Sequence, residues 1–347
     1  MNILFICGRE PSYARNRILL NSLKYNKYNI IKCTSSSKNT IKRSIEVLLK
    51  FLKNKNKADI IFVGFLGHHL VPIIKFFTKK PIIFDAFISI YDTLIYDRKK
   101  LKKNSLASKL VYSLEKKACD YSNKIILDTN QHISYFVKTF KINKKKLYKI
   151  PVGAEEDIFY PRKGGKNKKF TVFFYGYFLN LHGIHYIIKA ANILKKENIQ
   201  FIITGKGQTY KKCIKLYKSF KIKNIIFKKE TSIKEISNNI AKCDIGLGIF
   251  GKTNKTRRVI PNKVYQILAM KKPLITAKTP ASKELLTNHK DVLFCKPKNS
   301  EDLAKKILEL KNNKSLSKKI AENGYKTFKK QSSLPIISKI LKKIIEN

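Results

Sequence analysis

Short apolar runs alternate with longer stretches of helical period along most of the chain. In the first half, six such runs have the length and content of buried parallel strands, with room for a helix between successive runs. They are Ile3–Ile6, Tyr28–Cys33, Asp59–Val63, Pro81–Phe84, Lys124–Leu127 and Leu147–Ile150. This alternation is typical of βαβ units, so we predict a parallel sheet with helices on both faces.

The alternation stops near the middle of the chain and then begins again. Glycine, proline and charged residues are concentrated between positions 151 and 169, which predicts a linker over residues 156–169. Six further strand-like runs follow, at Phe170–Tyr175, Ile199–Thr204, Asn224–Phe227, Asp244–Gly248, Pro273–Thr276 and Val292–Phe294. Apolar residues recur at helical spacing from Glu301 to the end of the chain, which predicts amphipathic helices that pack on a core.

We therefore predict the α/β class with two doubly wound, Rossmann-like domains. The N-terminal domain is expected over residues 1–155, the C-terminal domain over residues 170–330, and a final helix over residues 331–347. Open α/β sheets bind ligands beyond the carboxyl ends of their strands, where the strand order reverses. Two such sheets facing each other would form an interdomain cleft, and residues directly after strands are the candidate ligand contacts.

The net charge is far from zero. The 347 residues include 74 Lys and Arg against 23 Asp and Glu, a formal net charge of +51. Clustered cations are typical of proteins that bind nucleic acid or an anionic membrane. Here the excess is spread over both halves, which compositional drift of a whole proteome would also produce. A basic nucleic-acid-binding protein is the alternative function, but we expect no nucleic-acid partner because no recognisable module of that kind is present.

Cysteine use and hydropathy indicate the compartment. Six cysteines stand singly, without the paired spacing of zinc sites, so we predict small buried hydrophobes and no metal site. The charge-free stretch from Ile60 to Ile74 is too short to span a bilayer, and no signal peptide is visible. We therefore expect a cytoplasmic protein.

Polar residues are frequent after the fourth predicted strand. Asp85, Asp92 and Arg98 stand there among aromatic and aliphatic residues, and burying such groups is costly unless they bind a ligand or one another. We interpret these three residues as part of a ligand site. An internal network of aspartate and arginine with a helix cap is the structural alternative.

Glycine turns follow two strands of the second half. Gly176 ends the first of these strands, and His182 and Gly183 open the next helix, whose free backbone amides suit a diphosphate. Gly205 and Gly207 follow the next strand, where the missing side chains let a base or ribose lie against the backbone. Turns and helix caps without a ligand are the alternative.

Cations precede a later helix that starts at a proline. Within Gly248–Lys263, we interpret Arg258 and Lys263 as the groups that neutralise a leaving diphosphate, because an apolar strand and an apolar helix bracket the segment. A solvated run of charge is the alternative.

In these segments the chain resembles the family 4 glycosyltransferases, and the likeness runs from residue 1 to about residue 330. The matching pieces are Tyr175-Gly-Tyr-Phe178, Thr204-Gly-Lys-Gly207, Asp244-Ile-Gly-Leu-Gly248 and Arg257-Arg-Val-Ile-Pro-Asn-Lys263, with Pro151-Val-Gly-Ala154 closing the first domain. The family has the GT-B fold and transfers sugars with retention and without metal. The resemblance implies a hexosyltransferase-type enzyme that uses a UDP- or GDP-sugar and no cofactor, with Gln266 and Glu284 holding ribose or sugar hydroxyls. It also implies that Asp85, Asp92 and Arg98 are the catalytic residues that orient the acceptor substrate.

Some positions depart from the family pattern. Arg258 and Gln266 stand where many members have two glutamates eight positions apart, and Tyr177 and His182 stand where an arginine and a lysine bind phosphate. We interpret these changes as a variant site. A non-catalytic partner that binds a nucleotide sugar is the alternative.

Two basic clusters in the first half, Arg98–Lys103 and Lys141–Lys146, bear on location. Lys and Arg near an anionic bilayer contribute about 1 kcal/mol each to binding. We therefore predict peripheral attachment to the inner face of the membrane, with a lipid-linked or cell-surface glycan precursor as the acceptor.

Overall fold

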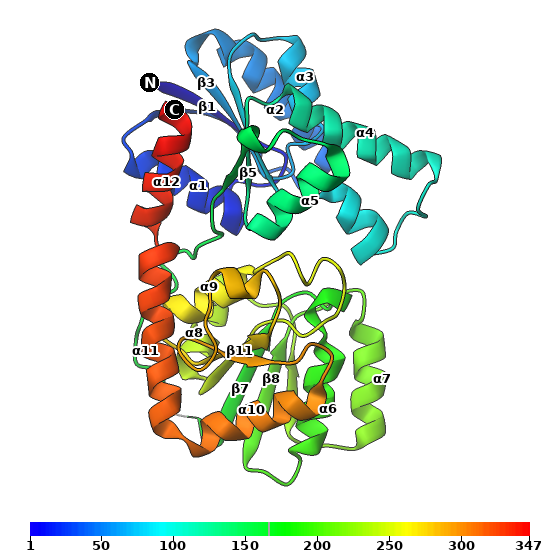
Figure 1. Ribbon diagram of the computed structural model, residues 1–347, viewed down its shortest axis with the longest axis vertical. Coiled ribbons are helices and arrows are strands. Elements are labelled where there is room, and N and C mark those ends of the chain that lie inside the picture. Colours follow the sequence, from blue (N-terminus) through cyan, green and yellow to red (C-terminus); the bar gives the residue numbers. More distant parts are fainter. Residues whose placement is uncertain (166) are drawn as a thin grey trace. The chain divides into compact units, whose positions relative to one another are not determined.

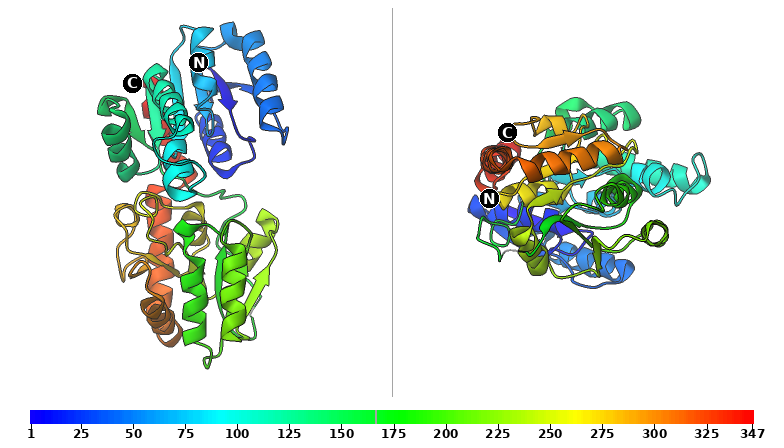
Figure 2. Two further views of the ribbon diagram at one scale, coloured as in Figure 1. Left: turned by 90° about the vertical axis from the view of Figure 1, so that its right-hand side faces the viewer. Right: turned by 90° about the horizontal axis from the view of Figure 1, so that it is seen from below.

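The computed structural model describes residues 1–165 and 167–347, so Lys166, within the predicted linker, lies outside the described residues. The chain forms two compact units (Figure 1). The first consists of Met1–Gly153 together with Ser333–Asn347, and the second of Ala154–Ser332. Each unit has its own parallel sheet, with helices on both faces (Figure 2).

The sheet of the first unit has six parallel strands in the order β2-β1-β3-β4-β5-β6. They are β1 (Asn2–Cys7), β2 (Asn29–Cys33), β3 (Ile60–Gly64), β4 (Ile82–Phe87), β5 (Lys124–Leu127) and β6 (Leu147–Lys149). The helices before the last strand are α1 (Ala14–Tyr25), α2 (Thr40–Asn54), α3 (Leu70–Phe76), α4 (Leu106–Tyr121) and α5 (Asn130–Phe140). Shorter turns are a π-helical one at Asp92–Asp97 and 3-10 turns at Lys55–Lys57 and Lys144–Lys146.

Helices cover both faces of this sheet because alternate strand residues are apolar on both sides. Residues of α2, α3, α4 and α5 pack against one face, and residues of α1 pack against the other. The final helix, α12 (Leu334–Glu346), joins α1 on that second face through Ile337, Leu341 and Ile344. The C-terminal helix is therefore part of the first unit, and not an appendage to the second.

The sheet of the second unit also has six parallel strands, in the order β12-β11-β10-β7-β8-β9. They are β7 (Phe170–Tyr175), β8 (Ile199–Thr204), β9 (Ile225–Lys228), β10 (Ile245–Leu247), β11 (Leu274–Ala277) and β12 (Leu293–Cys295). The helices are α6 (Ile184–Ile193), α7 (Tyr210–Phe220), α8 (Ile233–Lys242), α9 (Asn262–Ala269), α10 (Ser300–Asn312) and α11 (Lys314–Gln331). Two 3-10 turns lie at Asn180–His182 and Ser282–Glu284.

The predicted strands of both sheets are confirmed, as is the predicted pair of doubly wound α/β folds. The ends of the strands differ from the predicted ends by at most one residue, except that β4 continues three residues further, to Phe87. Among the described residues, no helix combines the length and the apolar character needed to cross a membrane.

The segment after Gly153 packs on the second unit, although the sequence predicted a linker from residue 156. The Arg162 guanidinium donates to Ser237 Oγ at 2.8 Å and to Asn238 Oδ1 at 2.9 Å, both on α8. Ser237 Oγ in turn donates to the Ile158 carbonyl at 2.6 Å. The turn-forming and charged residues therefore belong to a strap, a segment whose described residues form neither helix nor strand and which is hydrogen-bonded to the second unit. The predicted linker is wrong in this respect.

Asp85 lies inside β4 and is fully buried, whereas the sequence placed it after the strand as a substrate-orienting residue. Its carboxylate pairs with the fully buried Arg15 of α1, whose Nη2 and Nε donate to Oδ1 at 2.8 and 3.1 Å. Arg15 Nη1 also donates to the carbonyls of Ile150 and Pro151. The internal Asp–Arg network is therefore the better description of Asp85, with Arg15 and not Arg98 as the partner.

Asp85→Asn should destabilise the first unit, because it leaves the buried Arg15 guanidinium without a counter-charge. We expect the free energy of unfolding in urea to fall by about 3 kcal/mol or more. The control is Asp120→Asn, which removes an exposed pair with Lys116 on α4 and should cost less than about 1 kcal/mol. Native stability together with lost activity in Asp85→Asn would instead show a catalytic role for Asp85.

Candidate functional site

The strand order of the second sheet reverses between β10 and β7, and two glycine turns meet at this point. Gly176 follows β7 with φ +133°, and Gly205 follows β8 with φ +135°. A Cβ on Gly205 would lie 2.2 Å from the Gly176 carbonyl oxygen, so the two turns touch backbone to backbone. Gly207, with φ +147°, approaches the Phe178 backbone in the same way. These positions require glycine for both space and conformation.

Lys263, near the start of α9, has its amine beside the Gly176 turn. The side chain is 4 % exposed, and Nζ has no hydrogen-bond partner among the described residues. Nζ lies 4.0 Å from the centre of the Phe174 ring, and a Cβ on Gly176 would be 2.9 Å from it. Burial holds the pKa of Lys263 well below its usual value. A buried amine without an acceptor is costly, which points to an anionic ligand as its partner.

His182 lies beside the same turn, with a Cβ on Gly176 placed 3.5 Å from its Cε1. Its Nδ1 donates to the Tyr177 carbonyl, so the ring proton is held at Nδ1 and Nε2 carries the lone pair. Burial, and then the charge of Lys263, hold the pKa of His182 well below its usual value. A neutral imidazole can accept a hydrogen bond from a hydroxyl but cannot act as a phosphate-binding cation, the role that the sequence analysis considered for this position.

Gln266 is one turn further along α9, and both ends of its amide are bound within the protein. Tyr175 OH donates to Gln266 Oε1, and Gln266 Nε2 donates to Glu155 Oε2 at 3.0 Å. Glu155 is 3 % exposed, and its Oε1 has no hydrogen-bond partner among the described residues. The structure therefore gives Gln266 a bridging role, where the sequence predicted direct contact with ribose or sugar.

Glu155 was not among the predicted site residues. The only signal for it was an acidic residue directly after the Pro151–Ala154 turn. Burial, and then the charge of Glu155, raise the pKa of Tyr175 well above its usual value, so Tyr175 stays a hydrogen-bond donor.

A pocket of about 160 Å³ opens at the ends of β7 and β8. It is lined by Tyr175, Gly176, Tyr177, Thr204, Gly205, Lys206, Glu230, Thr231 and Ile236. Thr204 Oγ1 is buried and has no hydrogen-bond partner among the described residues, while Lys206 and Glu230 form an ion pair at 2.7 Å. The predicted turn residues Gly176 and Gly205 thus line one pocket. Glu230 and Thr231 line it too, although the sequence had not pointed to either of them.

The remaining predicted residues of the second unit have different surroundings. Gly183 adopts a left-handed conformation with φ +67°, and a Cβ there would lie 2.6 Å from the Gly251 amide nitrogen. Arg258 and Glu284 are partly buried, in the loop before α9 and in the 3-10 turn Ser282–Glu284. The Ala281 amide donates to the Arg257 carbonyl at 3.1 Å, so the segments that carry Arg258 and Glu284 are joined through their backbones.

In the first unit, Asp92 is buried on the π-helical turn, where its amide donates to Ser89 Oγ at 3.0 Å. Arg98 is exposed at the end of the same turn. The Asp85 carboxylate is bound by Arg15 and is therefore not available to act on a substrate together with Asp92 and Arg98.

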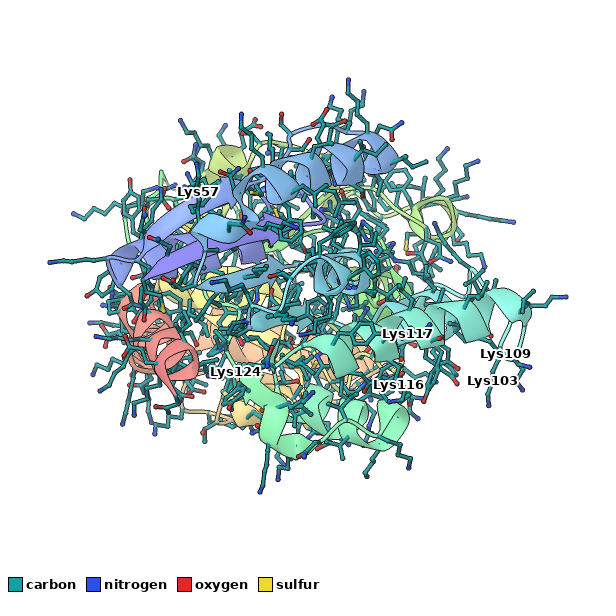
Figure 3. All side chains as sticks on the ribbon, turned by 90° about the horizontal axis from the view of Figure 1, so that it is seen from above. Lys57, Lys103, Lys109, Lys116, Lys117 and Lys124 are labelled. Carbon is teal, nitrogen blue, oxygen red and sulfur yellow. The ribbon has the colours of Figure 1, made fainter. Side chains whose placement is uncertain are left out.

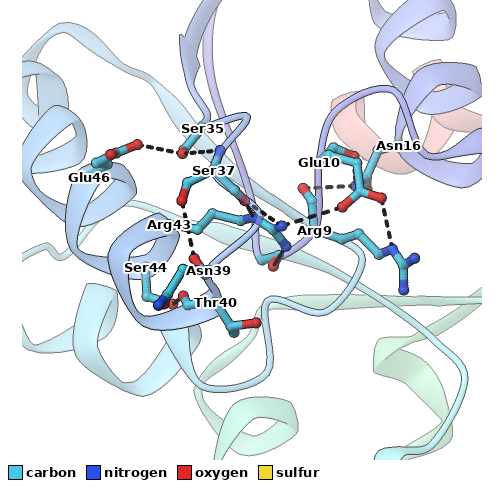
Figure 4. A network of polar contacts seen from close by, with 11 residues as sticks. Arg9, Glu10, Asn16, Ser35, Ser37, Asn39, Thr40, Arg43, Ser44 and Glu46 are labelled. Carbon is cyan, nitrogen blue, oxygen red and sulfur yellow. Dashed lines mark hydrogen bonds and ion pairs between the residues drawn. The ribbon is translucent and has the colours of Figure 1, made fainter.

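A larger pocket of about 650 Å³ lies at the carboxyl ends of β1, β2 and β3. Figure 4 shows the polar network at its wall. Arg43 of α2 donates to the carbonyls of Ser37, at 2.8 Å, and Gly8, at 3.2 Å, and lies 3.6 Å from the Glu10 carboxylate. Arg9, Lys38 and Glu10 also line the pocket, so three cations, one carboxylate and several hydroxyls surround it.

Gly205→Ala should lower the free energy of unfolding of the second unit by roughly 2 kcal/mol or more, because it adds both strain and a backbone clash. Urea unfolding, followed by circular dichroism, measures the effect. Gly165→Ala is the matched control, since a Cβ there meets its nearest atom, Lys242 Cε, only at 4.0 Å. Equal stability of the two variants would contradict the backbone contact between the glycine turns.

Comparison with known proteins bears on both units. A family model described as glycosyl transferases group 1 matches residues 156–327. An uncharacterised glycosyltransferase of Methanocaldococcus jannaschii is 26 % identical over 240 residues, which cover 67 % of this chain and 60 % of that relative.

Solved structures share the fold at low sequence identity. The HepE protein of Anabaena has a TM-score of 0.73 with 13 % identity, over 99 % of both chains. Sucrose-phosphate synthase of Thermosynechococcus elongatus has a TM-score of 0.77 with 10 % identity, over 99 % of this chain and 98 % of that one. The chain therefore has the GT-B fold, and residues 156–327, which lie within its second unit, match the model of the group 1 glycosyltransferases.

Proposed function

We propose that the chain is a glycosyltransferase of the EC 2.4 class that takes a sugar from a nucleoside diphosphate, with Lys263 binding the diphosphate. The observation that carries the proposal is the buried Lys263 amine, which has no acceptor among the described residues and lies against Gly176. A diphosphate oxygen would supply that acceptor, and the backbone amides of the glycine turns would add further donors.

A uridine nucleotide is our first candidate for the donor, and a guanosine nucleotide is the second. Crystal structures of HepE are described in complex with UDP, with UDP and glucose, and with UDP-glucose. In this chain the pocket beside Gly176 and Gly205 offers the buried Thr204 hydroxyl and polar groups of Glu230 and Thr231. A nucleoside attached to the diphosphate would occupy this pocket.

We propose that transfer proceeds with retention of configuration. The bond between the anomeric carbon and the diphosphate oxygen breaks, and its electron pair stays on the diphosphate. The acceptor oxygen bonds to the anomeric carbon on the same face and passes its proton to the departing phosphate oxygen. Lys263 stabilises the charge that develops on the leaving group, so the scheme uses neither a metal nor a nucleophilic side chain.

Acceptor binding belongs to the first unit in this proposal. The pocket at the ends of β1, β2 and β3, with Arg9, Lys38 and Arg43 in its wall, suits a hydroxylated acceptor that carries negative charge. Asp92 and Arg98 are still candidates for orienting the acceptor. Asp85 is not, because its carboxylate is paired with Arg15. We propose a lipid-linked or surface-glycan acceptor and a cytoplasmic enzyme held at the inner face of the membrane.

Lys263→Met should separate function from stability. Without the amine, release of UDP from a UDP-sugar should fall about 100-fold, the usual effect of losing one donor to a developing oxyanion. With chelator present, saturating UDP should raise the melting temperature of the native chain by several degrees and that of the variant by much less. Differential scanning fluorimetry and a UDP-release assay measure both effects.

The free variant should be at least as stable as the native chain. The folded state lowers the pKa of Lys263, so between that lowered pKa and the ordinary lysine pKa the unfolded chain binds more protons than the folded chain. Burial of the amine therefore lowers the free energy of unfolding at every pH below the ordinary lysine pKa. Lys211→Met, at an exposed position of α7, is the control and should change neither UDP binding nor turnover. If Lys263→Met retained the UDP shift and native turnover, the diphosphate site would lie elsewhere.

A further inference from the structure

The outer surface of α2 is apolar, although the helix already buries another face in the core. Val47 and Phe51 are fully buried against the sheet. On the outer side, Ile41, Ile45, Leu49 and Leu52 are 74 %, 54 %, 62 % and 39 % exposed, and their spacing places them along one stripe. A surface helix of a soluble protein normally presents polar residues on that side, so this stripe has no partner within the unit.

The neighbouring helix α3 extends the same surface. Ile73, Phe76 and Phe77 are 40 %, 84 % and 40 % exposed at its end. Lys55, in the turn that follows α2, donates from Nζ to the Phe77 carbonyl at 3.3 Å and lies 5.7 Å from the centre of the Phe77 ring. We call the seven exposed apolar residues of these two helices the α2–α3 face.

The charge around the α2–α3 face is positive. Residues 38–80 contain ten Lys and Arg and only two acidic residues, Glu46 and Asp59. Both acidic side chains are bound within the unit, Glu46 by the Ser35 hydroxyl and Asp59 by the Asn2 amide. Lys57, in the turn that follows α2, is among the lysines labelled in Figure 3. Exposed apolar side chains within a field of cations are what an anionic lipid surface binds.

A second copy of the chain fits this face poorly, because two molecules that each carry a net charge of +51 repel each other. We propose that the α2–α3 face docks on a bilayer of anionic phospholipid. The inference rests on the membrane location proposed above, and it moves the attachment from the predicted Arg98–Lys103 and Lys141–Lys146 clusters to α2 and α3.

Docking through this face brings the membrane close to the pocket of the first unit. Thr40 and Arg43 line that pocket, whereas Ile41 and Ile45 of the same helical turns belong to the α2–α3 face. The two features are therefore about one helix diameter, roughly 10 Å, apart. An acceptor carried on a lipid could enter the pocket without leaving the membrane.

Vesicle flotation of the full chain tests the proposal, with vesicles of about 30 % phosphatidylglycerol in phosphatidylcholine and with pure phosphatidylcholine. The native chain should float with the anionic vesicles only. Ile45→Ser/Leu49→Ser should reduce binding by about tenfold or more, because two inserted side chains are lost. It should keep the UDP-induced rise in melting temperature, which separates failure of docking from failure of the donor site.

The matched control uses the other exposed apolar pair of the first unit. Leu106 and Leu110 of α4 are 76 % and 62 % exposed, near the Arg98–Lys103 cluster, and Figure 3 shows Lys103 and Lys109 at that end of α4. Leu106→Ser/Leu110→Ser should bind vesicles within about twofold of the native chain, since its apolar contact with lipid is not used. Loss of binding in this control, or native binding in Ile45→Ser/Leu49→Ser, would overturn the proposal.

Fluorescence gives a second readout, because the chain contains no tryptophan. Phe76→Trp places a single indole at the most exposed residue of the α2–α3 face, and Leu106→Trp places one on α4. Anionic vesicles should shift the emission of Phe76→Trp to shorter wavelength and leave that of Leu106→Trp unchanged. The reverse pattern would overturn the proposal in favour of docking through α4. Absence of vesicle binding by the native chain would overturn it in favour of an acidic protein as the partner of the α2–α3 face.

Discussion

Burial of the Lys263 amine, without a hydrogen-bond acceptor among the described residues, is the constraint on which the site depends. An amine in this position costs folding free energy, since it loses water and gains the faces of the Phe174 and Tyr175 rings in return. Burial lowers its pKa for the same reason. An anion bound beside it would restore the proton and supply the missing partner, so the unfavourable free state and tight binding of an anion have one physical origin.

The surrounding backbone holds the amine in place. The turns at Gly176 and Gly205 touch, and a side chain on either would meet backbone or the lysine itself. Beneath them, Gln266 joins the Tyr175 hydroxyl to the Glu155 carboxylate and so connects α9 to β7 and to the strap that begins the second unit. Access for a ligand to the backbone and rigidity of the amine therefore come from the same few residues.

The sheets and the glycine turns could be predicted from the sequence because they follow from local pattern. Runs of apolar residues between helical segments define buried parallel strands, and Gly176 and Gly205 directly follow two of them. Partners distant in sequence could not be predicted. Asp85 pairs with Arg15 seventy positions away, and Glu155 reaches Gln266 across 111 positions, so no local spacing distinguishes these internal pairs from ligand contacts.

Isothermal titration of UDP at a series of pH values up to the ordinary lysine pKa, in buffers of different ionisation enthalpy, tests the role of Lys263 most directly. The amine of the free protein loses its proton as the pH rises through its lowered pKa, and the diphosphate should raise that pKa again, so binding should take up protons. We predict proton uptake by the native chain and none by Lys263→Arg, whose guanidinium stays charged at all these pH values. UDP binding by the native chain without proton uptake would contradict the role given to Lys263.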